Sequence, residues 1–270
     1  MTLRARACAA ADRDVVEAFL AQGGSADAWL RHGVVVGGLA GFFGAFEERR
    51  PVALVLLRGG ALSAARNSTP EGIRALTPVL RSRDPWYSIV GPEAPCSLLA
   101  AELAGRRPPR VDRLQVLMSV EDASQLGPDE PRLRSAVPAD VDALAPLVAR
   151  YRFEDGLSGE SEDPAGWVRA HLRERVAQGC VYLYEEEGEP VFTGAFNFRG
   201  PAGSGLGGIF TAAHARGRGI AARCTARLCR LGLAEGPVVN LHVDERNAPA
   251  RRCYRRAGLH DDGLFRLTFR

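Results

Sequence analysis

Apolar residues in the second half of the chain alternate between the spacing of strands and the spacing of helices. A period of two, rich in β-branched and aromatic residues, predicts strands at 133–137, 181–185, 190–198, 205–211, 238–243 and 264–269. A period near 3.6 predicts helices at 138–150, 163–177, 218–234 and 248–257. The order is strand, two helices, three strands, helix, strand, helix and strand, which is typical of a mixed α/β layer.

The first half repeats part of this order in a weaker form. Helices are predicted at 14–22, 70–81 and 94–104, and strands at 52–57, 61–65, 87–90 and 114–120. The similar order indicates a weak internal duplication. Three prolines and a glycine interrupt the pattern at 124–138, so we expect two domains, residues 1–125 and residues 126–270.

Composition narrows the class of protein. The chain has 270 residues, of which 46% are hydrophobic and 25% charged, and this excludes a disordered, collagen-like or disulfide-stapled chain. Six scattered cysteines without a C-x-x-C pair indicate reduced thiols, and no metal site is expected. The longest uncharged apolar run, 33–46, is shorter than the ~20 residues that cross a membrane. We therefore expect a soluble cytoplasmic protein without a membrane partner.

A glycine-rich turn joins the predicted strand 205–211 to a long predicted helix. Its sequence is Arg216-Gly217-Arg218-Gly219-Ile220-Ala221. Glycines let successive backbone N–H groups face one point at a helix N-terminus, where the helix dipole also favours an anion. By itself this pattern fits a phosphate site and an ordinary strand-to-helix turn equally well. It also fits an RNA-contacting tract, although it lacks the repetition of such tracts.

A second motif follows one strand later. Asn247 is a natural N-cap, Pro249 lies in the first turn, and Gly258 is a natural stop, which predicts a helix of about three turns. Asn247, Ala250 and Tyr254 have the i, i+3, i+7 spacing that places them on one face of that helix.

Together, Arg216-x-x-Gly219-x-Ala221 and Asn247-x-x-Ala250-x-x-x-Tyr254 resemble the GNAT superfamily of acetyl-CoA-dependent N-acetyltransferases. The resemblance covers residues 132–270. It implies a GNAT fold in this half and acetyl transfer from acetyl-CoA to a primary amine by direct attack. Residues 1–125 lack both motifs, so they are expected to form a degenerate GNAT-like copy or an unrelated substrate-recognition domain.

The resemblance also implies roles for individual residues. Tyr254 would be the general acid for the leaving thiolate, and His242 is either a general base or a packed strand residue. The other residues would bind acetyl-CoA: the acetyl carbonyl at Ile209, Phe210 and Thr211, the pyrophosphate at Arg216, Gly217, Arg218, Gly219, Ile220 and Ala221, and the pantetheine arm at Asn247 and Ala250.

Charge placement suggests where the two substrates bind. Residues 214–256 hold ten arginines and three acids, which suits a polyanionic coenzyme. Residues 154–189 hold ten acids and three arginines, so we expect a small-molecule or peptide amine to meet Glu154, Asp155 or Glu160. The net charge of +3 gives no reason to expect nucleic acid, and the chain is expected to be a monomer or a homodimer. Two alternatives stay open: an acyl-CoA sensor without turnover, and nucleic-acid binding through the arginines.

Overall fold

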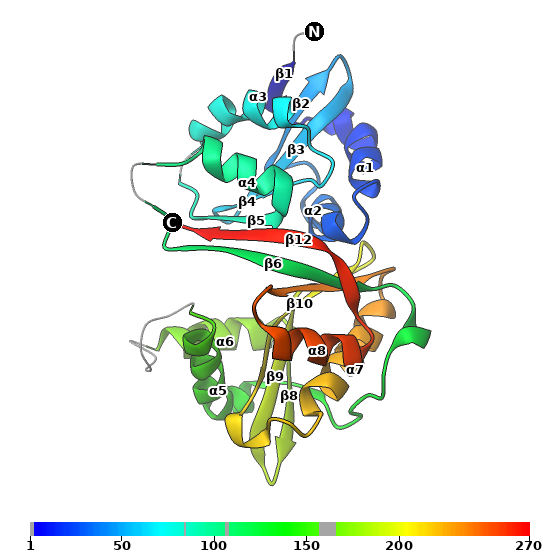
Figure 1. Cartoon of the computed structure of the whole chain (residues 1–270), viewed down its shortest axis with the longest axis vertical. Helices are drawn as coiled ribbons and strands as arrows, with labels where there is room; N and C mark the ends of the chain where they lie inside the picture. Colours follow the sequence, from blue (N-terminus) through cyan, green and yellow to red (C-terminus); the bar gives the residue numbers. More distant parts are fainter. Residues whose placement is uncertain (1–2, 84, 106–107, 157–165) are drawn as a thin grey trace.

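The two halves of the chain lie end to end along one continuous sheet, with helices packed on both halves (Figure 1). The computed structural model describes residues 3–83, 85–105, 108–156 and 166–270. In this part of the chain the sheet has twelve strands, in the order β1-β2-β3-β4-β5-β12-β6-β11-β10-β9-β8-β7. The predicted mixed α/β class is confirmed.

The described residues of the first half form ten helices and strands, apart from short 3₁₀ turns. They are β1 (Arg4–Ala7), α1 (Arg13–Ala21), α2 (Ala28–Gly37), β2 (Phe42–Glu47), β3 (Arg50–Arg58), β4 (Ala61–Ala64), α3 (Pro70–Arg81), β5 (Ser88–Pro92), α4 (Glu93–Glu102) and β6 (Val111–Val120).

The second half repeats that order element by element. Its elements are β7 (Arg134–Ser135), α5 (Val141–Glu154), α6 (Trp167–Ala177), β8 (Val181–Glu186), β9 (Glu189–Phe198), β10 (Ser204–Thr211), α7 (Ile220–Leu233), β11 (Val239–Asp244), α8 (Ala248–Ala257) and β12 (His260–Phe269).

Three elements of the first half, β1, α2 and β2, were not predicted. The apolar run 33–46 contains five glycines and no regularly spaced polar residues. It therefore shows neither the period of two typical of strands nor the period of 3.6 typical of helices. The structure divides the run at Gly38 and Gly41, whose φ angles of +56° and +81° end α2 and start β2. The strand expected at 133–137 is only two residues long. Residues 163–165, the predicted start of the helix at 163–177, lie outside the described residues.

The halves exchange their last strands. Strand β6, from the first half, runs antiparallel to β11 from Val120 opposite Val239 to Gln115 opposite Asp244. Strand β12, from the second half, runs antiparallel to β5 on its other side. Strands β6 and β12 also pair with each other, so the chain crosses the middle of the sheet twice (Figure 1).

Polar contacts lock this crossing point. A short 3₁₀ turn, η2 (Gly24–Asp27), reaches from the first half to β11 and β12. The carbonyl of Ser25 accepts a hydrogen bond of 2.7 Å from the Asn240 side chain. Both the Ser25 hydroxyl and the Ser119 hydroxyl donate to the Asp262 carboxylate. Because these contacts join four separate segments, the two halves pack as one body around β6 and β12.

Candidate active site

Strands β10 and β11 separate partway along their length. They run parallel and pair only at Ser204 opposite Val239 and Gly205 opposite Asn240. Beyond that point β10 continues along β9 to Thr211, whereas β11 continues along β6. A cavity of about 940 Å³ opens where they separate.

A bulge in β10 widens the opening. The pairing of β10 with β9 shifts between Gly207 and Phe210, so that Gly208 and Ile209 fall inside the irregularity. Gly208 has a φ of +61°, a backbone conformation that other residues adopt at a cost. A bulge re-aims the backbone groups of the bulged strand. Ile209, Phe210 and Thr211 line the cavity, and the Thr211 hydroxyl is buried without a hydrogen-bond partner in the described chain.

The glycine turn closes one end of the cavity. Gly217 and Gly219 have φ angles of +81° and +79°, and Gly219 is the N-cap of α7. The Arg223 N–H donates to the Gly219 carbonyl, which makes this the first i→i−4 bond of the helix. The N–H groups of the first turn therefore have no acceptor within the helix and point out of its N-terminus. This is the geometry of an anion site.

The arginine side chains of the turn are engaged with carboxylates of neighbouring elements. Arg216 donates to Glu154 at 2.8 Å and to the Thr211 carbonyl at 3.0 Å. Arg218 makes two bonds, of 2.7 and 2.9 Å, to Glu186 at the end of β8. The turn is thus held against α5 and β8 through its side chains, which leaves the backbone N–H groups to bind an anion.

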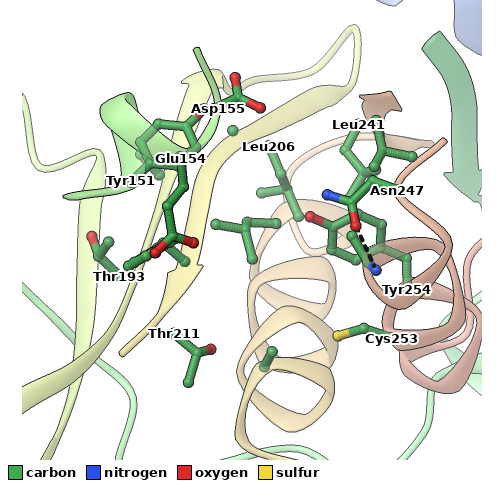
Figure 2. A pocket seen from close by; sticks show the side chains of 18 of the residues that line it. Tyr151, Glu154, Asp155, Thr193, Leu206, Thr211, Leu241, Asn247, Cys253 and Tyr254 are labelled. Carbon is green, nitrogen blue, oxygen red and sulfur yellow. Dashed lines mark hydrogen bonds between the residues drawn. The ribbon is translucent and has the colours of Figure 1, made fainter. Parts of the chain in front are cut away.

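Helix α8 forms the opposite wall (Figure 2). The Asn247 side-chain oxygen accepts the Ala250 N–H at 3.1 Å, which caps the helix as the sequence predicts. Tyr254 is buried, and burial raises the pKa of its hydroxyl, so the phenol stays protonated at neutral pH. Figure 2 shows Asn247 and Tyr254 across the cavity from Tyr151, Glu154 and Asp155.

His242 lies on β11 beneath the cavity. Its ring stacks on Phe265 of β12 at a centroid distance of 5.8 Å, and its Nδ1 has no hydrogen-bond partner among the described residues. Burial, with a smaller contribution from Arg113, lowers the pKa of His242 to about 4. The imidazole is therefore neutral at pH 7.

The far end of the cavity includes residues from both halves of the chain. Arg113 of β6 lies between two carboxylates, with its guanidinium nitrogens 3.7 Å from Asp155 and 3.8 Å from Asp244. Gln115, two residues along the same strand, is 6% exposed, lines the cavity and has an unpartnered Oε1. Burial is the main cause that raises the pKa of Asp155, and the Asp244 charge raises it further.

Most of the predicted site residues come together in this cavity. Those that line it are Tyr254, His242, Ile209, Phe210, Thr211, Arg216, Gly217, Gly219, Ile220, Ala221, Asn247, Ala250, Glu154 and Asp155. The Arg218 side chain turns to Glu186 instead, and Glu160 lies outside the described residues. Glu154, expected to meet the acceptor, pairs with Arg150 and Arg216 next to the glycine turn.

Several lining residues were not predicted. They include Gln115, Tyr151, Arg152, His171, Leu267 and Phe269. Gln115 lies in the other half of the sequence, and only the strand exchange brings it here. Arg152 and His171 lie on two helices whose packing the sequence does not specify. The sequence signal that could have indicated Gln115 is its polar side chain within a mostly apolar predicted strand, 114–120.

Comparison with known proteins identifies the class of protein to which this fold belongs. Residues 143–259 match the model of the acetyltransferase (GNAT) family. This half of the chain is a GNAT acetyltransferase domain, and the protein is an acyltransferase of that type. The resemblance inferred from the two motifs is confirmed. Comparison with curated protein sequences gives no match.

Solved structures share the fold over the whole chain. An acetyltransferase of the GNAT family from Colwellia psychrerythraea aligns with a TM-score of 0.56 and 13% identity, covering 100% of both chains. A GCN5-related N-acetyltransferase from Sphaerobacter thermophilus aligns with a TM-score of 0.57 and 20% identity, covering 99% of this chain and 95% of that one. A tandem GNAT protein from the clavulanic acid biosynthesis pathway aligns with a TM-score of 0.53 and 13% identity, covering 99% and 98%. The predicted tandem arrangement is therefore confirmed at the level of the fold.

Two further observations concern the described residues only. None of their helices is both long and apolar enough to cross a membrane. They also contain no group of three or more His, Cys, Asp or Glu side chains placed to hold a metal ion.

Proposed function

We propose that the protein transfers an acetyl group from acetyl-CoA to the nitrogen of a primary amine. The observation that carries this proposal is the separation of β10 from β11 beside the glycine turn, with Tyr254 on the opposite wall. The same cavity is lined by Gly219 and Ile220 at the α7 N-terminus, where a pyrophosphate would bind, and by Gly208 in the bulge. A thioester and its nucleophile would meet at that bulge.

The residues around the turn fit the coenzyme. A pyrophosphate is bound well by the unpaired N–H groups at the start of α7, reinforced by the helix dipole. A side chain at Gly219 would have its Cβ 3.1 Å from the Arg223 guanidinium, and φ of +79° would be strained as well. On the other wall, Asn247 and Ala250 line the cavity and would contact the pantetheine arm.

The reaction requires polarisation of the thioester carbonyl, loss of a proton from the amine nitrogen and protonation of the leaving sulfur. The amine nitrogen attacks the thioester carbon, and the C–O π electrons move onto the oxygen, which backbone N–H groups of the β10 bulge would stabilise. The tetrahedral intermediate collapses, the C–S bond breaks, and the sulfur takes a proton from Tyr254. The nitrogen gives up its proton, and a phenolate at Tyr254 would be reprotonated through solvent.

Two side chains could accept the proton from the amine. His242 has a pKa near 4, so an alkylammonium would transfer a proton to it only at a large energetic cost. Asp155 has a pKa raised by burial and lies in the cavity near Arg113, which makes it the stronger of the two candidates. Neutral His242 would then accept a hydrogen bond at Nδ1.

We further propose that residues 1–125 are a degenerate GNAT-like copy that does not bind coenzyme. Strands β4 and β5 also pair at only two positions, but the space beyond is filled. A Cβ at Gly91 would lie 2.9 Å from both Ser63 Oγ and Cys96 Sγ. At the start of α3, the Thr69 hydroxyl already accepts the Gly72 N–H, and Glu71 adds a negative charge.

Acetyl transfer is tested by thiol release from acetyl-CoA across a panel of primary amines, with the acetylated product identified by mass spectrometry. Amine-dependent thiol release is the expected result. Tight binding of acetyl-CoA by calorimetry without turnover on any amine would instead support an acyl-CoA sensor. Binding to DNA that acetyl-CoA does not displace would favour the nucleic-acid alternative, with a steep salt dependence.

A further inference from the structure

Arg152 lines the cavity, and it has no acidic partner among the described residues. It lies on the last turn of α5, is half-buried and lines the cavity. No carboxylate in the described part of the chain lies within ion-pair distance of its guanidinium. The guanidinium instead lies over the Trp167 ring, 4.3 Å from the centroid. A partly desolvated cation without a counter-charge is unfavourable, so an anionic ligand would stabilise this arrangement.

Further cationic and donor groups surround Arg152. His171 and Arg175 of α6 line the same part of the cavity. Trp167 stacks on His171 at 4.9 Å, so the imidazole and the Arg152 guanidinium both contact the same indole. Burial and the charges of Arg175 and Arg152 all lower the pKa of His171, so it is neutral at pH 7 and can donate one N–H. This side of the cavity favours an anion and disfavours a simple cationic amine.

Groups that accept hydrogen bonds lie immediately beside this positive side. Asp155 follows Arg152 by three residues, a spacing that places their Cβ atoms about 5–6 Å apart at a helix end. The Asp155 carboxylate is 3.7 Å from Arg113, which is longer than a hydrogen bond and leaves its oxygens able to accept. The buried Oε1 of Gln115 has no partner in the described residues, and Gln115 also lines the cavity.

Building on the proposed acetyl transfer, we infer that the acceptor is a small molecule that carries a carboxylate as well as the primary amine. Its carboxylate binds Arg152, with His171 as a second donor, because the planar guanidinium matches a carboxylate with two parallel hydrogen bonds. Its ammonium binds Asp155 and the Gln115 oxygen before losing a proton. The ammonium of an amine without a negative group is repelled by the Arg152 guanidinium. A peptide N-terminus has no carboxylate on the same residue as its amine, so it has no group to bind Arg152.

The test compares acceptors in matched pairs that differ only in the carboxylate. One pair compares an amino acid with its amide, and a second pair compares the same amino acid with its decarboxylated amine. Thiol release is the readout for both. We expect kcat/KM for the amino acids to exceed that for both partners by at least tenfold. Equal rates within every pair, or faster transfer to the amides, would overturn the inference while leaving acetyl transfer to amines intact.

A substitution assigns the effect to Arg152. In Arg152→Gln we expect KM for amino acids to rise at least tenfold, with little change in kcat or in KM for the decarboxylated amines. The matched control is Arg169→Gln, on α6 beside Asp142 and outside the cavity residues, which should leave all constants unchanged. An equal loss on all acceptors in Arg152→Gln would overturn the assignment. Thiol release with none of the amines would contradict the proposed function itself, which the inference requires.

Discussion

Arg113 and Asp155 lie on opposite sides of the chain's midpoint but meet at the same end of the cavity. Arg113 Nη2 donates a 2.9 Å hydrogen bond to the Asp155 carbonyl oxygen and lies 3.7 Å from its carboxylate. Arg113 belongs to β6, which pairs along the whole of β11. A strand from the first half therefore forms part of the proposed acceptor end of a site whose proposed coenzyme end belongs to the second half.

This exchange predicts that residues 126–270 do not fold alone. Without β6, the core around α7 and β11 loses Val116, Met118 and Val120, and the burial of each such side chain contributes about 1.5–3 kcal/mol. Strand β12 cannot replace β6, because it runs parallel to β11 and the lost strand ran antiparallel. Circular dichroism of the fragment should show no cooperative thermal transition, and co-expression with residues 1–125 should restore one. A fragment that melts cooperatively and binds acetyl-CoA would contradict the prediction.

The glycine turn predicts a specific loss of coenzyme binding. In Gly219→Glu, the side chain is forced into a left-handed conformation, and its charge repels a pyrophosphate at the α7 N-terminus. We expect the Kd for acetyl-CoA to rise more than tenfold by calorimetry. Gly179→Glu is the matched control, since Gly179 has a similar φ of +68° and open space around it, but lies outside the cavity residues. If both variants bind acetyl-CoA equally, the turn does not hold the pyrophosphate.

Most of the fold could be predicted from the sequence because the periodic segments are long and well capped. Helix α3 and helix α8 begin and end at the predicted residues, each with a proline in its first turn. The strand exchange could not be predicted, since the apolar pattern of β6 or of β12 does not specify whether that strand pairs with β5 or with β11. Pairing partners depend on how the helices pack, which a strand's own sequence does not record.

The proposed coenzyme end of the cavity could be predicted, whereas only Asp155 could be predicted among the residues argued for the proposed acceptor end. Gly219 and Asn247 are set by local backbone geometry, which neighbouring residues in the sequence determine. At the acceptor end, the charges near Asp155 come from Arg113 and Asp244 on separate strands. The predicted acidic segment also includes Glu185 and Glu186, whose carboxylates pair with Arg134 and Arg218.

Tyr254 predicts a change in kcat rather than in binding. Tyr254→Phe removes the proton donor for the thiolate but keeps the buried ring. Because its raised pKa makes the phenol a weak acid, we expect kcat to fall about 10–100-fold, at the low end for a general acid. The Kd for acetyl-CoA should change less than twofold. Tyr87→Phe, at an exposed tyrosine, is the control that should retain full activity, and unchanged kcat in Tyr254→Phe would exclude the acid role.

The pKa of His242 predicts the shape of the pH–rate profile. With a pKa near 4, the imidazole does not change protonation state between pH 6 and 9. The profile of kcat/KM should therefore show no limb near pH 6.5 that depends on this residue, and His242→Gln should leave its shape unchanged. A limb near pH 6.5 that disappears in His242→Gln would show that the histidine titrates during turnover and would restore it as the general base.

Asp27 in η2 predicts how stability depends on pH. Its side chain is fully buried, its Oδ1 accepts the Arg66 N–H at 2.9 Å, and its Oδ2 is unpartnered in the described structure. Burial raises its pKa to about 7, well above the value of about 3.9 for an unfolded chain. The folded state thus holds this proton more tightly than the unfolded state. The resulting stabilisation is complete below about pH 4 and is lost as the pH rises from 4 through 7.

Asp27→Asn isolates this effect because an amide oxygen can still accept the Arg66 N–H without carrying a charge. We expect the variant to be more stable than the natural chain at pH 8 by roughly 2–4 kcal/mol, with a smaller difference at pH 5. Urea unfolding at both pH values measures the difference, and Asp14→Asn, at an exposed position on α1, controls for net charge. The opposite sign, with Asp27→Asn less stable at pH 8 than at pH 5 relative to the natural chain, would mean that the folded protein stabilises the ionised carboxylate. In that case Arg66 and Arg31, the two cations that lower its pKa, would outweigh burial.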